Sequence, residues 1–242
     1  KGEKDAPRAG EHTHLGGRCD PKPAARMRDC RRRPTESATM LMTLILIAVT
    51  CVVTLLAFNN RKLAGALILW PPAVTRRHEY WRLLSYGLVH ANGQHLLFNM
   101  ITLFFFGRAM EGLYAQYLGP FGFVLFYAGG LLVSILPSYW ANRNNANYHS
   151  LGASGAVSAV LFAFILLQPW AMIFVFYFPL PAILYAVAYI AYSIYMDHRG
   201  ADNVNHSAHM WGAAYGILFT VIMEPRVVLV FVDQLKHPHF GI

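Results

Sequence analysis

The chain has 242 residues, of which 56% are hydrophobic and 13% are charged. This composition excludes an ordinary soluble domain, where about a quarter of the residues are charged. The formal net charge is +8, and ten of the 20 lysine and arginine residues fall within residues 1–38. Because this segment is also poor in apolar residues, we expect residues 1–38 to be a basic, disordered tail.

Six apolar segments follow the tail, each close to the length of about 20 residues that crosses a bilayer core. The first, residues 40–58, reads MLMTLILIAVTCVVTLLAF. It has no charge, is too long for a signal peptide and lacks a small-residue cleavage site. The other segments are residues 94–113, 119–139, 151–168, 180–196 and 205–223.

These segments predict an all-α integral membrane protein, a six-transmembrane-helix bundle over residues 39–224. Residues 225–242 contain RVVLVFV, which is too short to cross a bilayer and is expected to be a surface segment. Eight basic residues near the spans fall on the side of the tail and seven on the other, so charge does not orient the bundle. The three cysteines, Cys19, Cys30 and Cys51, form no disulfide framework.

Polar side chains inside membrane spans are costly and point to functional sites. His95 and Asn99 lie four residues apart in the second segment, so they share one helix face. Ser154 lies near the start of the fourth segment, and His209 near the start of the sixth. Even-numbered spans of a six-helix bundle run in the same direction, so we expect these four residues at a similar depth below one surface.

Small residues predict close packing of the fourth and sixth segments. Gly212 and Gly216 form a G-x-x-x-G pattern on the face of His209, which lets two helices approach closely. Gly152 and Gly155 flank Ser154 in the sequence HSLGASGAVSAV. We therefore expect the Ser154 hydroxyl and the His209 imidazole to come within hydrogen-bonding distance.

This pair has the chemistry of a serine hydrolase, because an imidazole can take the proton of a serine that attacks a carbonyl. The resulting oxyanion needs donors, and the candidates are the Asn99 amide, the His95 ring and the Ser154 backbone N–H. Glu111 is the only acid within a predicted span, but it lies about 18 Å along the helix from Asn99, too far to complete a triad. The sequence therefore predicts a Ser154–His209 dyad with no metal and no cofactor.

The motifs resemble those of the rhomboid intramembrane serine proteases and point to a bacterial member. They are WR at 81–82, HANGQHLLFN at 90–99, GASG at 152–155 and AHMWGAAYG at 208–216, and the resemblance covers about residues 40–223. It implies a six-helix fold with Ser154 as nucleophile and His209 as general base. It also places His95 and Asn99 at the family's oxyanion positions.

The same resemblance implies supporting roles for other residues. His90 matches a further motif histidine near the site, Trp81 and Arg82 match a structural motif of the first loop, and Glu111 matches a buried carboxylate that ties together the loop and helix ends. Family members cleave single-pass membrane proteins near the outer face. The expected location is therefore the bacterial inner membrane, with the tail in the cytoplasm.

One position departs from the family pattern. Some members carry an aromatic residue four positions after the nucleophile, stacked on the catalytic imidazole, and here that position is Ser158. His206, Trp211 and Tyr215 are the candidates for holding the His209 ring instead.

Two other functions fit parts of the sequence. A zinc hydrolase could use His206 and His209 with Asp202, His90 or His95 as ligands, but it leaves Ser154 and its glycines unexplained. A catalytically inactive, client-binding relative has no chemical need for the serine, histidine and asparagine. Nucleic-acid binding is not expected, because six acidic residues interrupt the basic tail. The substrate and the oligomeric state are not specified by the sequence.

Overall fold

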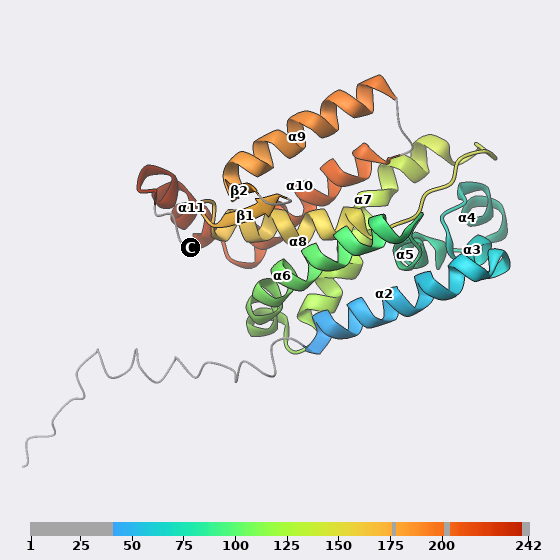
Figure 1. Cartoon of the computed structure of the whole chain (residues 1–242), viewed down its shortest axis with the longest axis horizontal. Coiled ribbons are helices and arrows are strands. Elements are labelled where there is room, and N and C mark those ends of the chain that lie inside the picture. The colour runs from blue at the N-terminus through green and yellow to red at the C-terminus, as the bar shows by residue number, and fades with distance from the viewer. Residues whose placement is uncertain (1–40, 176–177, 201–203, 239–242) are drawn as a thin grey trace, which may run out of the picture. The chain divides into compact units, whose positions relative to one another are not determined.

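The computed structural model describes residues 41–175, 178–200 and 204–238 (Figure 1). The predicted tail, residues 1–38, and the candidate ligand Asp202 lie outside the described residues. Six helices correspond to the six predicted segments: α2 (Leu41–Asn59), α6 (Gly93–Leu118), α7 (Gly122–Asn142), α8 (Ser154–Leu167), α9 (Ala182–Arg199) and α10 (His206–Met223).

Shorter elements connect and extend these helices. Those between α2 and α6 are α3 (Arg61–Leu67), α4 (Pro71–Arg77), α5 (Arg82–Ser85) and the 3-10 helix η1 (Tyr86–Leu88). Two short antiparallel strands, β1 (Met172–Val175) and β2 (Phe178–Pro181), precede α9. The predicted surface segment contains a helix, α11 (Arg226–Lys236).

The prediction of a helical membrane protein is confirmed. Within the described residues, α2, α6 and α7 are each long and apolar enough to cross a bilayer. A fourth crossing is added if α10 and α11, which meet at a bend of 113°, form one broken span. The exact number of six spans therefore stays a prediction.

Helix α8 lies in the middle of the bundle, and α6, α7, α9 and α10 pack against it (Figure 1). It has only 14 residues, and eleven of them are buried. A helix that is hydrophobic on all sides suits a protein core or a membrane, and the burial of α8 places it inside the bundle. The segment that carries Ser154 is thus the core of the domain.

Two helix boundaries differ from the predicted ones because of glycine conformations. Helix α6 continues past residue 113 to Leu118 and ends at Gly119, whose φ is +75°. Helix α8 begins at Ser154 instead of residue 151, because Gly152 has a φ of +111°, which a helix does not accommodate.

The predicted close contact between α8 and α10 is present. A Cβ added to Gly212 would lie 2.0 Å from the carbonyl oxygen of Gly155, and one added to Gly216 would lie 2.1 Å from that of Ala159. Both distances are far below van der Waals contact, so the two backbones touch where only glycine fits. Gly155 itself leaves no room for a side chain, because its Cβ would lie 2.2 Å from the Ser134 hydroxyl.

Candidate active site

Ser154 and His209 meet across the contact of α8 with α10. Ser154 is the first residue of α8, and His209 lies in the first turn of α10. The distance from Ser154 Oγ to His209 Nε2 is 2.8 Å. This is the separation at which a hydroxyl can donate its proton to an unprotonated imidazole nitrogen.

The position of Ser154 at a helix start supplies further polar groups. The first N–H groups of a helix have no acceptor within the helix, and the helix dipole places partial positive charge there. Negative charge that develops next to Ser154 would therefore meet backbone donors of α8. Such fixed donors are what an oxyanion requires.

Hydrogen bonds fix the segment of backbone that precedes Ser154. Leu69 and Ser150 exchange two backbone hydrogen bonds of 2.9 and 3.1 Å. Gly152 donates its N–H to the carbonyl of Tyr86 at 3.0 Å. The backbone is thus held on both sides of residue 151, three residues before the candidate nucleophile Ser154.

His90 adds the next anchor of this segment. Its Nε2 accepts the N–H of Ala153 at 3.3 Å, and its Nδ1 lies 3.1 Å from the Thr54 hydroxyl. Thr54 donates its only hydroxyl proton to the carbonyl of Leu88, so Nδ1 of His90 must carry the proton and donate to Thr54. Burial, together with the neighbouring His95, lowers the pKa of His90 below its ordinary value, which keeps the ring neutral.

His95 lies directly over Gly152. A Cβ on Gly152 would come within 2.5 Å of Cε1 of the His95 ring, so this position requires glycine both for its φ and for space. The His95 ring also stands edge-on to His90, with 4.9 Å between the centroids. The structure therefore brings His95, one of the two candidate oxyanion residues, against the backbone that precedes Ser154.

Asn99 is buried one turn further along α6. Its amide donates to the carbonyl of His95 on the same helix, at 2.8 Å. An amide has two N–H groups, so this bond fixes the plane of the side chain and uses one of them.

An asparagine at the start of α10 places His209. The Asn205 side chain accepts the N–H of Ala208 and the hydroxyl proton of Ser138, each at 3.0 Å. It also donates to the Tyr148 hydroxyl at 3.0 Å. Asparagine is a preferred N-cap residue, so the NHSAH sequence contained this signal, which our sequence analysis did not use.

The His209 ring is held by an aromatic residue that the sequence analysis did not identify. Tyr189 of α9 stacks on His209 with 5.8 Å between centroids and 27° between planes. Its hydroxyl lies 2.6 Å from that of Ser158. Of the three predicted candidates, His206 contacts the His209 ring edge-on at 5.7 Å, Trp211 is half exposed, and Tyr215 packs against Phe126 and Phe219.

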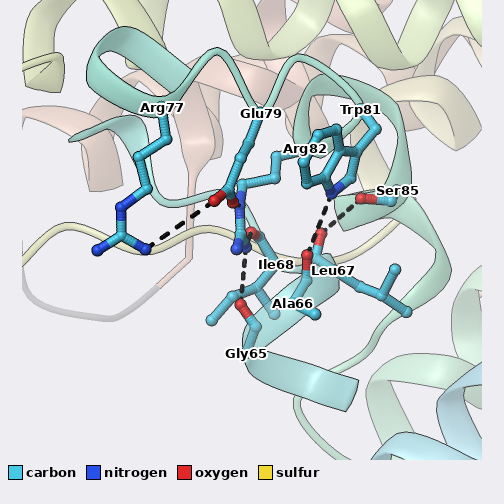
Figure 2. A network of polar contacts seen from close by, with 9 residues as sticks. All are labelled: Gly65, Ala66, Leu67, Ile68, Arg77, Glu79, Trp81, Arg82 and Ser85. Carbon is cyan, nitrogen blue, oxygen red and sulfur yellow. Dashed lines mark hydrogen bonds and ion pairs between the residues drawn. The ribbon is translucent and has the colours of Figure 1, made fainter. Parts of the chain in front are cut away.

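Trp81 and Arg82 belong to a polar network in the first loop, shown in Figure 2. Arg82, which is buried, pairs with Glu79 and donates to the carbonyls of Gly65 and Ile68 at 2.7 and 2.8 Å. Trp81 donates to the carbonyl of Ala66.

Ser85 completes this network by donating to the carbonyl of Leu67 at 2.7 Å (Figure 2). Side chains thus satisfy four consecutive carbonyls, those of residues 65–68, at the end of α3, where a helix leaves its carbonyls unpaired. The two motif residues cap a helix of the loop and do not contact the dyad in this network.

Glu111 holds the start of α2. Its carboxylate accepts the N–H groups of Met42 and Thr43 at 2.9 and 2.8 Å, and the Thr43 hydroxyl proton at 2.6 Å. A carboxylate at a helix N-terminus satisfies the free N–H groups and complements the helix dipole. Glu111 therefore ties α6 to α2.

The described residues do not assemble the zinc ligands considered from the sequence. No three His, Cys, Asp or Glu side chains among residues 41–175, 178–200 and 204–238 gather in a metal-binding arrangement. His209 Nε2 faces Ser154, and both ring nitrogens of His90 are engaged by Thr54 and Ala153.

Comparison with known proteins gives consistent similarities. The family model described as "Rhomboid domain" matches residues 77–226. The rhomboid protein YdcA of Bacillus subtilis (strain 168) is 28% identical over 167 residues, which are 66% of this chain and 78% of YdcA.

Two relatives with mitochondrial names are also similar. RHOMBOID-like protein 12, mitochondrial, of Arabidopsis thaliana is 33% identical over 148 residues, 54% of this chain and 43% of that protein. Rhomboid protein 1, mitochondrial, of Saccharomyces cerevisiae is 33% identical over 137 residues, 54% of this chain and 38% of that protein. The chain thus spans most of YdcA but less than half of either mitochondrial relative.

Proposed function

The chain belongs to the rhomboid family, and from this premise we propose that it is an intramembrane serine endopeptidase. The observation that carries the proposal is the 2.8 Å separation of Ser154 Oγ and His209 Nε2 at the starts of two closely packed helices. The proposed substrates are single-pass transmembrane proteins, cleaved near the outer face of the membrane. No cofactor takes part.

The proposed reaction has two halves. His209 takes the proton of the Ser154 hydroxyl as Oγ attacks the scissile carbonyl, and the protonated imidazole then passes this proton to the leaving amine. A water molecule, deprotonated by His209, next attacks the acyl-serine ester, the ester C–O bond breaks to release the new carboxyl end, and His209 returns the proton to Ser154 Oγ. The Ser154 N–H, the His95 ring and the Asn99 amide stabilise the oxyanion in both halves.

The proposal also includes the membrane in which the chain lies and its orientation there. We propose that the chain lies in a bacterial inner membrane with its tail in the cytoplasm, the arrangement that its motifs' resemblance to the rhomboid proteases implies. A tag at the N-terminus of the protein should be cleaved by added protease in inverted membrane vesicles but not in right-side-out vesicles. Accessibility in right-side-out vesicles would reverse the orientation.

The dyad is tested by three alanine variants purified in detergent. Ser154→Ala and His209→Ala should remain folded and lose cleavage of a transmembrane substrate, because each lacks one partner of the proton transfer. His206→Ala should retain part of the turnover, because His206 contacts the His209 ring edge-on and the Ser154 hydroxyl bonds His209. If His206→Ala were the inactive variant and His209→Ala the active one, the base would be His206.

Labelling with a serine-directed fluorophosphonate separates the alternatives. The parent protein should be labelled, with or without a chelator, and Ser154→Ala should not. Turnover that a chelator abolishes would favour the zinc hydrolase. A folded parent that is neither labelled nor active would favour a client-binding protein without catalysis.

A further inference from the structure

Tyr189 connects the two helices of the dyad from a third helix. Its ring stacks on His209 of α10, and its hydroxyl is hydrogen-bonded to Ser158 of α8 at 2.6 Å. We infer that Tyr189, held by Ser158, is the positioning residue that fixes the ring of the general base in this chain. This inference rests on the proposed function, because it assigns a role at the same dyad.

The arrangement closes a ring of contacts around the dyad. Ser158 lies four residues after Ser154, so both side chains project from the same face of α8. Ser154 contacts His209, His209 stacks on Tyr189, and Tyr189 returns to Ser158. The position of the His209 ring is therefore fixed, through Tyr189, by α8, the helix that also carries Ser154.

Each contact restricts a different motion of the imidazole. The Ser154 hydroxyl fixes the direction of Nε2, but rotation about that line would still tilt the ring. A nearly parallel aromatic ring at 5.8 Å resists this tilt. Ser158 is only 3% exposed, and a buried hydroxyl pair is costly to break, which holds the Tyr189 ring in place.

This geometry explains how the His209 ring can be held although position 158 is not aromatic. A large side chain there would occupy the space that Tyr189 fills. The serine instead supplies a polar anchor for an aromatic ring that comes from α9. The placement cannot be read from spacing along one helix, because 31 residues separate the two partners.

The first experiment removes the ring. Tyr189→Leu should lower kcat by about threefold to tenfold, the range expected for loss of one aromatic contact. The KM should stay unchanged, and the rate of fluorophosphonate labelling of Ser154 should fall by a similar factor, because both steps need the base in place. Tyr195→Leu is the matched control on α9: its ring is exposed, its hydroxyl accepts from Arg199 of the same helix, and kcat should match the parent.

The second experiment keeps the ring and removes its anchor. Tyr189→Phe and Ser158→Ala each delete one partner of the same hydrogen bond, so each should lower kcat by less than Tyr189→Leu does. The double variant should be no slower than either single variant, because the two substitutions remove one shared interaction. These variants also decide the question if Tyr189→Leu does not fold.

The third experiment moves the ring to the other helix. Ser158→Tyr combined with Tyr189→Leu should recover kcat and labelling relative to Tyr189→Leu alone, which a purely structural role of Tyr189 would not produce.

Two outcomes separate this inference from the proposed function. In the first outcome, the parent cleaves and is labelled, and the variants have the same kcat per folded molecule as the parent. The variants compared are Tyr189→Leu or, if it does not fold, Tyr189→Phe and Ser158→Ala. This outcome overturns the positioning role of Tyr189 and leaves the proposed protease function intact. A parent that is folded but neither cleaves nor is labelled overturns the proposed function itself.

Discussion

At the scale of single residues, Asn99 is a buried side chain for which we propose a catalytic role in addition to packing. Its amide plane is fixed by the bond to the His95 carbonyl, and its side chain is 6% exposed. A fixed amide loses no orientational freedom when an oxyanion forms, which is the condition for effective electrostatic stabilisation. The same bond lies within α6 and joins no second helix to it, so its contribution to the packing of the bundle is small.

The two contributions of Asn99 predict different results for Asn99→Ala. If the second N–H stabilises the oxyanion, turnover should fall by roughly 10²–10³. The melting temperature should change little, because the packing term is small. Fluorophosphonate labelling of Ser154 should weaken but persist, since Ser154 and His209 remain.

The double variant with His95→Ala completes this test. Both residues are proposed to act on one oxygen, so the combined loss of turnover should be smaller than the product of the two single losses. A sharp fall in melting temperature with normal cleavage by the folded fraction would show that Asn99 is only a packing residue.

At the scale of elements, the contact of α8 with α10 sets the distance within the dyad. Gly212 lies one turn after His209 on α10, and its Cα faces the carbonyl of Gly155, the residue after Ser154. Any increase in the separation of the two backbones would therefore increase the distance from Ser154 Oγ to His209 Nε2. The glycines thus set the spacing on which the proposed proton transfer depends.

Two glycine-to-alanine substitutions should have opposite effects on stability. Gly212→Ala gains about 1 kcal/mol of helix propensity, but its Cβ would lie 2.0 Å from a backbone oxygen, and overpacking of this kind costs about 1–3 kcal/mol. Gly65→Ala in α3 gains the same propensity and meets nothing within 4 Å. We expect Gly212→Ala to lower the melting temperature and the turnover, and Gly65→Ala to raise the first and leave the second unchanged. A Gly212→Ala protein that is stabilised would contradict the close contact.

The sequence could predict this contact because small residues at helical spacing are a local pattern. Gly212 and Gly216 lie four residues apart, and Gly155 is one of the small residues on the facing segment. This pattern predicts that the two helices pack together and that Ser154 approaches His209. The boundaries were less accurate, since they depend on the backbone conformations of Gly119 and Gly152, and a glycine in the sequence does not state its own φ.

The sequence could not predict the partners that come from distant elements. Tyr189 reaches His209 only because α9 docks beside α10, and Thr54 reaches His90 only because α2 docks against the loop before α6. Neither contact produces a repeating pattern of residues in the sequence. The motif residues could thus be found, whereas the side chains that hold them required the arrangement of the helices.

At the scale of the whole molecule, α2 is attached to the rest of the bundle at two levels. Near its start, Met42 and Thr43 donate to the carboxylate of Glu111. Further along, Thr54 bonds the Leu88 carbonyl and faces His90, which in turn holds the backbone before Ser154. The first predicted span is therefore linked to the site through a chain of hydrogen bonds.

This attachment predicts the effect of removing the basic tail. Glu111 accepts the N–H groups of Met42 and Thr43 at the start of α2, so these two capping bonds do not depend on residues 1–38. We expect the truncated protein to cleave a transmembrane substrate in detergent at the rate of the parent, with the free energy of unfolding changed by less than about 0.5 kcal/mol. Glu111→Gln is the matched comparison: it should destabilise the protein, because it removes the charge and aims an amide N–H at donors already present. A truncated protein that is folded but inactive would mean that residues 1–38 contribute to substrate binding or catalysis.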